Sequence, residues 1–168
     1  MLSQRNAARS RAADHENETR ARQAEWERED RRRDLVERRE CYVALLVALR
    51  RIRVESREYV DALRTGCADA AARQRIEEAR YNYRTRYSES SMVLPLAVEQ
   101  AARDVDSRLA VLWRTINDLA ATTPVDSAEA EHCANGLLDM RTDSRRLRAV
   151  MRADLGLATD QSEGWDQC

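Results

Sequence analysis

The chain has 168 residues, and its 29 basic residues nearly balance 30 acidic ones, which leaves a formal net charge of -1. This length suits one ordinary domain with tails, and the balanced charge favours neither a polyanion nor a membrane surface as partner. All the basic residues are Arg, which we attribute to a GC-rich genome rather than to particular contacts.

The N-terminal residues 1–34 predict a solvated helical arm. Apart from the first two residues, Trp26 is their only large apolar side chain. Four Glu residues precede Arg by four positions, an order that supports an isolated helix. These pairs are Glu16/Arg20, Glu18/Arg22, Glu27/Arg31 and Glu29/Arg33. The arm has no apolar face for a bilayer and no signal-peptide core, so we expect a cytoplasmic protein without membrane contact.

An imperfect heptad stripe begins at Leu35 and predicts the first bundle helix, which ends at Gly66. Its apolar positions are Leu35, Tyr42, Leu45, Leu46, Leu49, Ile52, Tyr59, Val60 and Leu63. The longest apolar run, Tyr42–Leu49, has eight residues. A membrane span needs about 20, so no transmembrane helix is expected.

The second predicted helix, residues 68–87, has a stripe of small residues and two rings. That stripe is Ala72, Ile76, Ala79, Tyr83 and Tyr87. It fades in the serines of residues 88–91, and Pro95 predicts a break before the third helix because Pro disfavours helical angles in the residue before it.

The third helix has the most regular repeat, and we expect it to be the central one. Its stripe is Val98, Ala102, Val105, Leu109, Leu112, Ile116 and Leu119. Pro124 separates it from the fourth helix, for which Asp126 and Glu129 form a predicted capping box. The fourth stripe is Cys133, Leu137, Met140, Ser144, Leu147, Met151 and Leu155, and Gly156 predicts its end.

Long helices joined by short loops predict an all-α fold, an antiparallel up-down-up-down four-helix bundle. We place the bundle at residues 35–157, the charged arm at 1–34 as a long N-terminal extension, and a flexible acidic tail at 158–168.

The sequence offers little machinery for chemistry, so we expect no enzyme and no cofactor. Glu129 and His132 have the Glu-x-x-His spacing of di-iron bundles, but the unit occurs once and the other histidine, His15, has no Glu three residues earlier. Cys133 lies on the apolar stripe and reads as a core thiol. The four cysteines show no paired spacing, so free thiols are expected.

Two Arg clusters favour an alternative function, a nucleic-acid-binding accessory protein of a mobile element. The candidate contacts are Arg80, Arg84, Arg86, Arg145, Arg148 and Arg152. Rings interleave with the first cluster, as in single-strand binding surfaces. Asp residues flank the second cluster, which favours an ordinary solvated face.

The stretch from Gln23 to Arg28, followed by the segment from Arg31 to Tyr42, resembles the opening of small helical actinobacterial proteins, some labelled Kil or plasmid-spread proteins. The resemblance covers residues 1–65. It implies a coiled-coil-like helical body and supplies no catalytic residues. Members of that group often begin with a membrane-spanning segment, and since we find none here, we expect no membrane-anchored role.

The leading interpretation is a non-enzymatic helical-bundle protein that associates with itself or with a partner helix through its arm and first helix. An imperfect heptad joined to a helix without a core of its own motivates this interpretation. The candidate partner contacts are Trp26, Leu35 and Tyr42.

Overall fold

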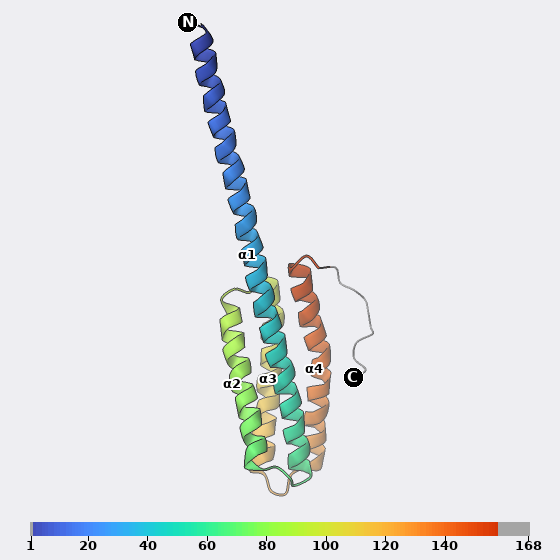
Figure 1. The fold of residues 1–168 in the computed structure, drawn as a ribbon. Coiled ribbons are helices and arrows are strands. Elements are labelled where there is room, and N and C mark those ends of the chain that lie inside the picture. Colours follow the sequence, from blue (N-terminus) through green and yellow to red (C-terminus); the bar gives the residue numbers. More distant parts are fainter. Residues whose placement is uncertain (1, 158–168) are drawn as a thin grey trace. The chain divides into compact units, whose positions relative to one another are not determined.

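The computed structural model describes the backbone of residues 2–157 and the side chains of residues 16–157, and it contains helices and no strand in that part (Figure 1). The helices are α1 (Leu2–Arg64), α2 (Ala70–Ser91), α3 (Leu96–Ala121) and α4 (Ser127–Asp154). The chain divides into two compact units, residues 1–38 and residues 39–168. The predicted tail at 158–168 and the side chain of His15 lie outside the described residues.

The first unit, residues 1–38, is a helix held by ion pairs along its own surface. All four predicted Glu/Arg pairs form, and Asp34 accepts a further hydrogen bond from Arg38 at 2.6 Å. Exposed pairs of this kind contribute about 0.2–0.5 kcal/mol each to a helix. The described side chains of this unit are largely exposed, so its helix is stabilised locally rather than by a core.

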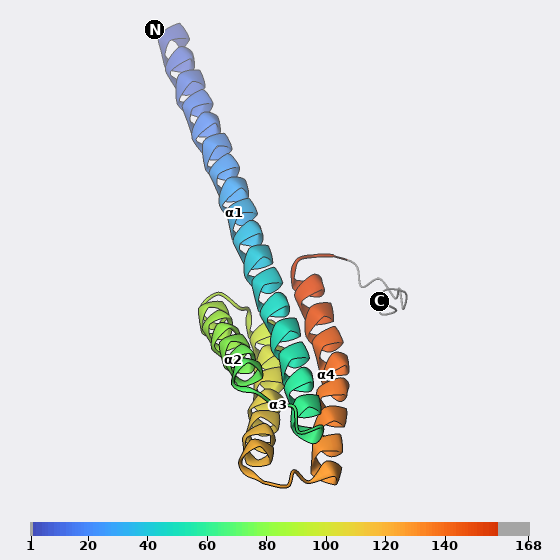
Figure 2. The ribbon, with the colours of Figure 1, turned by 60° about the horizontal axis from the view of Figure 1, so that its bottom comes forward.

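The second unit is a helical bundle in which the C-terminal part of α1, α2, α3 and α4 lie side by side (Figures 1 and 2). From α1 the buried side chains are Tyr42, Leu45, Ala48, Leu49, Ile52, Ser56, Tyr59 and Val60. These positions recur every three or four residues, so they share one side of the helix. This inward side of α1 packs into a single apolar core with the other three helices.

The core face of α3 differs from the predicted stripe at one position. Trp113 is buried at 6% exposure, whereas Leu112 is only half-buried. The larger ring takes the core position, and Leu112 lies toward α4, where its Cδ2 would come within 2.8 Å of a Cβ on Gly136. The lack of a side chain at Gly136 therefore makes room for Leu112 between the two helices.

Helix α2 continues beyond its predicted end through Ser91. The Ser90 hydroxyl donates to the Arg86 carbonyl at 2.6 Å, and the Ser91 hydroxyl donates to the Ser88 carbonyl at 2.8 Å. Serine side chains can bond to carbonyls of the preceding turn without ending a helix. The predicted fading at residues 88–91 was therefore wrong.

The other helix ends have the expected chemistry. Gly66 and Gly156 have φ values of +69° and +68°, the left-handed conformation that glycine adopts without strain. The amide of Cys67 bonds to the Ala62 carbonyl, and that of Leu157 bonds to the Arg152 carbonyl, both at 2.8 Å, as in Schellman ends. At the start of α4 the Asp126 carboxylate accepts from the Ala128 and Glu129 amides.

Polar contacts between helices follow a consistent order along the chain. Toward α2, the α1 residues Cys41, Arg51 and Glu55 contact Ser90, Glu78 and Arg75 in turn. Toward α4, Tyr42 and Arg53 contact Asp154 and Ser144. Contacts of α3 are Asn117 with Arg73 on α2, and Arg108 with Asp143 on α4. Early residues of one helix thus meet late residues of its neighbours.

Truncating an inward residue of α1 should cost far more stability than truncating an outward one. We expect Leu45→Ala to lower the free energy of unfolding by about 2–5 kcal/mol, because it opens a cavity at a position with 1% exposure. Val47→Ala, at 63% exposure, should change it by less than about 0.5 kcal/mol. Urea unfolding followed by circular dichroism measures both, and similar losses in the two variants would contradict the assignment of faces.

Candidate functional site

The outward side of α1 in the bundle unit carries an exposed row of valines. Val43, Val47 and Val54 are 55%, 63% and 43% exposed, and we call these three residues the valine face. They are spaced by four and seven residues, and because a helix turns by about 100° per residue, all three lie within about 40° of one another. An apolar stripe of this kind normally marks a side of a helix that is covered.

The valine face lies opposite the core side of the same helix. Leu45 and Ile52 are 1% and 3% exposed, and they fall about half a turn away from Val43 and Val54 around the axis. Helix α1 is thus apolar on two opposite sides, and the bundle uses only one of them. Two exposed charges, Glu40 and Arg50, flank the valine face on its outward side.

The three predicted partner contacts have different surroundings. Trp26 is 66% exposed and Leu35 is 41% exposed, both in the first unit. Tyr42 is 2% exposed, and its hydroxyl donates to the Asp154 carboxylate at 2.7 Å. Its ring and its hydroxyl are both engaged within the bundle, so we remove Tyr42 from the partner-contact set.

Sequence reasoning missed the valine face, although a signal was present. The apolar run Tyr42–Leu49 covers more than two helical turns, so its side chains must point in every direction. A single inward stripe can account for only part of such a run. Asking which of its residues the stripe leaves out would have identified Val43 and Val47.

The two predicted Arg clusters do not form one continuous surface. They lie on α2 and α4, each of which contacts α1 and α3, and Figures 1 and 2 show α2 and α4 on opposite sides of α1. On α2, Arg80 has its guanidinium carbon 4.2 Å from the centroid of the Trp113 ring, and Arg86 bonds to Glu89 at 2.9 Å. Arg84, Arg145 and Arg148 are exposed, and Arg152 is half-buried.

The rings near the first cluster are occupied by packing. Tyr83 and Trp113 are 3% and 6% exposed, and Tyr83 stacks on Tyr87 with centroids 6.1 Å apart. Burial, together with the charge of Asp106, raises the pKa of Tyr83. Single-stranded nucleic acid needs open ring faces on which bases can stack. This surface offers Tyr81 instead, which points away from the core at 77% exposure.

A groove of about 330 Å³ runs along α2 and α3 beside these rings. Asp106 lines it, and burial raises the pKa of this carboxyl while the charge of Arg84 lowers it. Burial and the charge of Arg84 both lower the pKa of Arg80. Within the described part of the chain, neither Asp106 nor Arg80 forms a hydrogen bond with a hydroxyl or thiol group.

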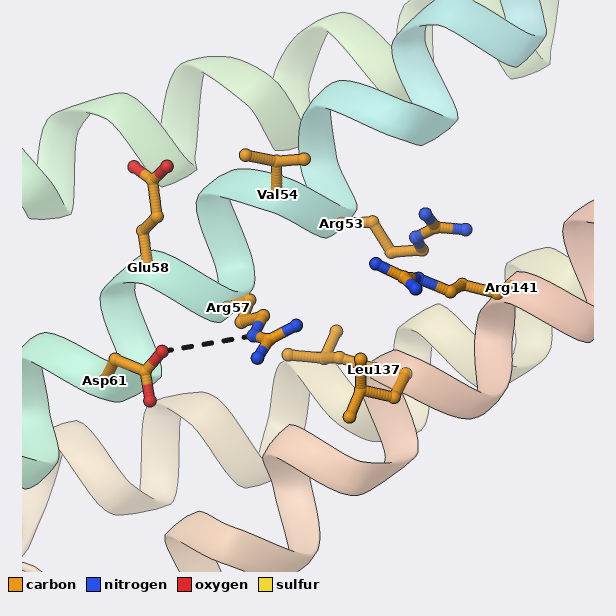
Figure 3. A pocket seen from close by; sticks show the side chains of 8 residues that line it. Arg53, Val54, Arg57, Glu58, Asp61, Leu137 and Arg141 are labelled. Carbon is orange, nitrogen blue, oxygen red and sulfur yellow. Dashed lines mark ion pairs between the residues drawn. The ribbon is translucent and has the colours of Figure 1, made fainter. Parts of the chain in front are cut away.

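A second groove, of about 280 Å³, lies along α1 and α4 (Figure 3). The Arg53 and Arg141 side chains extend toward each other, and Arg57 is paired with Asp61 at 4.0 Å (Figure 3). Val54 forms part of the α1 rim. The valine face therefore borders a groove whose lining includes the charged side chains of Arg53, Arg57 and Arg141.

Metal and thiol chemistry have little support among the described residues. Glu129 and His132 are exposed, and no group of three His, Cys, Asp or Glu residues within residues 16–157 is placed to hold a metal ion. Cys133 has 0% exposure, and burial, with the charge of Glu129, raises its pKa to about 11. A reactive thiolate needs the opposite shift.

No helix in the described part of the chain is long and apolar enough to cross a bilayer. No protein-family model matches the sequence, and no match appears among curated proteins or solved structures. The surfaces of the molecule itself are therefore the basis for assigning a role.

The cysteines should differ sharply in reactivity. At about pH 8 we expect iodoacetamide to label the exposed Cys67 and to leave Cys133 unmodified, because the Cys133 thiol is buried and stays protonated well above that pH. Peptide mass spectrometry distinguishes the two sites. Unfolding in urea should make Cys133 reactive, and rapid labelling of Cys133 in the folded protein would contradict its place in the core.

Proposed function

We propose that this is a non-enzymatic helical-bundle protein that acts by protein–protein association, with the outward side of α1 as its contact surface. The observation that supports the proposal is the valine face, defined above, on the side of α1 opposite the core. A partner helix laid on this face would cover it, as amphipathic helices cover grooves in known recognition modes.

Burial of the valine face by a partner would contribute to the free energy of association. Fully burying a valine side chain contributes on the order of 1.5–3 kcal/mol relative to leaving it exposed. Val43 and Val47 are more than half exposed, so a partner could still gain much of that contribution at each position. Losses in translational freedom and side-chain order offset part of it, which favours a dissociable complex.

We also propose that the bundle has the antiparallel up-down-up-down topology and that the charged N-terminal helix is an extension of it. The order of inter-helix contacts supports this topology, since early residues such as Tyr42 meet late residues such as Asp154. The exposed i,i+4 ion pairs favour a role for this N-terminal helix as a spacer. The exposed ring of Trp26 would be the large apolar group if the helix also contacts a partner. A cytoplasmic location belongs to the same proposal.

Placing a charge on the valine face should abolish association. We expect Val47→Arg to lose partners that the wild type retains in affinity capture from the native cell extract, and to lose any self-association seen by light scattering, because burying a charged guanidinium among apolar side chains is strongly unfavourable. Val111→Arg is the matched control, because Val111 is 52% exposed on α3.

Both variants should unfold with the same urea midpoint as the wild type. The proposal is contradicted if the wild type is monomeric and captures no protein that Val47→Arg loses. It is also contradicted if Val111→Arg reduces association as much as Val47→Arg does.

A further inference from the structure

We infer that the partner of the valine face is an amphipathic helix of another protein, that acidic residues border its apolar stripe on one side, and that these acidic residues lie over the junction of α1 and α4. The inference rests on the proposed function and names the chemistry of its partner. It comes from an unequal distribution of charge on the two sides of the valine face. Near Val54, one side carries arginines alone, and the other carries both signs of charge.

Helical geometry shows this difference around Val54. At about 100° per residue, three charged residues lie about 40°, 60° and 100° to one side of Val54, and three others lie at the same angles on the other side. On the first side they are Arg50, Arg57 and Arg53. On the second side they are Glu58, Arg51 and Glu55. The valine face is therefore bordered by positive charge on one side only.

Contacts with neighbouring helices show where each side lies in the bundle. On the first side, the Arg53 guanidinium donates to the Ser144 hydroxyl of α4 at 3.1 Å. On the second side, Glu55 forms an ion pair with Arg75 of α2 at 3.5 Å. The mixed side thus meets opposite charge on α2, whereas the arginine side meets a neutral hydroxyl on α4.

Helix α4 adds two arginines to the same junction. Arg141 and Arg148 lie three residues before and four residues after Ser144, so both are about 40–60° from it on the side away from the buried Leu147. Figure 3 shows the side chains of Arg53 and Arg141 extending toward each other across the groove. We define the arginine seam as Arg50, Arg53, Arg57, Arg141 and Arg148.

The described carboxylates leave much of the arginine seam without a counter-charge. Asp61 lines the same groove and lies 4.0 Å from Arg57. Arg50, Arg141 and Arg148 are exposed, and none of the three forms an ion pair with another residue in the range 16–157. A carboxylate placed between neighbouring guanidinium groups can accept charge-assisted hydrogen bonds from both of them. The seam is therefore suited to acidic side chains.

The valine face favours a protein helix over other anionic partners. The phosphates and sugars of a nucleic acid would neutralise the seam, but they offer little apolar surface to cover the adjacent valines. A helix with acidic residues beside an apolar stripe covers both surfaces at once. By excluding water from the junction, such a helix would also strengthen each contact between carboxylate and guanidinium.

A second copy of this chain matches the seam poorly. The two-fold axis of an antiparallel pair of helices keeps each residue on its own flank, so one arginine seam would meet the other. Like charges that face one another disfavour this pairing. A parallel pair would bring the seam against the α2 side of α1, which carries arginine as well as glutamate. A different protein can present acidic residues alone.

Two designed peptides test the chemistry of the partner. Both are fluorescein-labelled amphipathic helices of about 20 residues with the same leucine stripe. One carries Glu along one edge of the stripe, and the other carries Lys at the same positions. In fluorescence anisotropy at low salt, we expect the wild type to bind the Glu peptide roughly tenfold more tightly than the Lys peptide. The formal net charge of -1 for the whole chain would not favour the Glu peptide, so this preference would come from the seam.

Charge reversal in the seam should exchange this preference. We expect Arg50→Glu/Arg141→Glu to bind the Lys peptide more tightly than the Glu peptide. The matched control is Arg114→Glu/Arg146→Glu, which makes the same change of charge at exposed positions outside both grooves and should keep the wild-type preference. All four positions are exposed, so both variants should retain the circular dichroism spectrum of the wild type.

The outcomes separate this inference from the proposed function. A Glu peptide that binds the wild type no better than the Lys peptide overturns the inference, and so does a reversed variant that keeps the wild-type preference. In either case the proposed function stands if Val47→Arg loses an association that the wild type retains. Binding of the Glu peptide that is unchanged in Val47→Arg also overturns the inference, because the seam would then act without the valine face.

Two further measurements address the other occupants. A DNA oligonucleotide that displaces the labelled Glu peptide more effectively than the unlabelled peptide does would assign the seam to nucleic acid. A wild-type dimer in sedimentation equilibrium that Val47→Arg loses would assign the valine face to a second copy. Either result overturns the inference, and the second one leaves the proposed function intact.

Discussion

The structure depends on the burial of one side of α1 against three other helices. A helix in a four-helix bundle has neighbours on its inner side only, so roughly half of its circumference stays outside the core. Leu45, Leu49 and Ile52 occupy the inner side and are at most 3% exposed. The valines that remain on the outer side have no place in this chain's own core. The apolar character of α1 on two sides is therefore a consequence of where its neighbours lie.

The other helices show how distinctive this arrangement is. On α3 the buried residues form one stripe, and apart from Leu96 at its start, Val111 is its one exposed large apolar residue. On α2 the core side is narrow, with Ala72 and Ala79 allowing close approach of its neighbours. Among the described helices of the bundle unit, α1 alone has a row of buried apolar residues on one side and several regularly spaced, exposed valines on the opposite side. The proposed role in association rests on this combination, because apolar side chains gathered on one surface often mark interaction sites.

The sequence predicted the helices that have one regular apolar repeat, and it predicted the helix ends at which glycine adopts a positive φ. The stripe of α3 alternates spacings of three and four, and Gly66 and Gly156 mark ends that require positive φ. The sequence did not predict which neighbouring side chains enter the core, because this depends on packing between helices. Leu112 lies in the space beside Gly136 of the facing helix α4, and Trp113 takes the core position. The valine face could not be predicted from helical periodicity alone. The apolar run Tyr42–Leu49 supplies residues to both the inward and the outward side of α1, and the periodicity does not say which of these sides faces the core.

The most direct measurement of the central claim is a dilution series followed by NMR on valine-methyl-labelled protein, from about 10 µM to 1 mM. Our account predicts that the methyl signals of Val43 and Val47 shift either with concentration or when a protein recovered by affinity capture is added. The buried Val60, Val98 and Val105 should keep constant signals, because they belong to a core complete within one chain. Outer methyl signals that change in neither titration, or core signals that move together with them, would contradict the account.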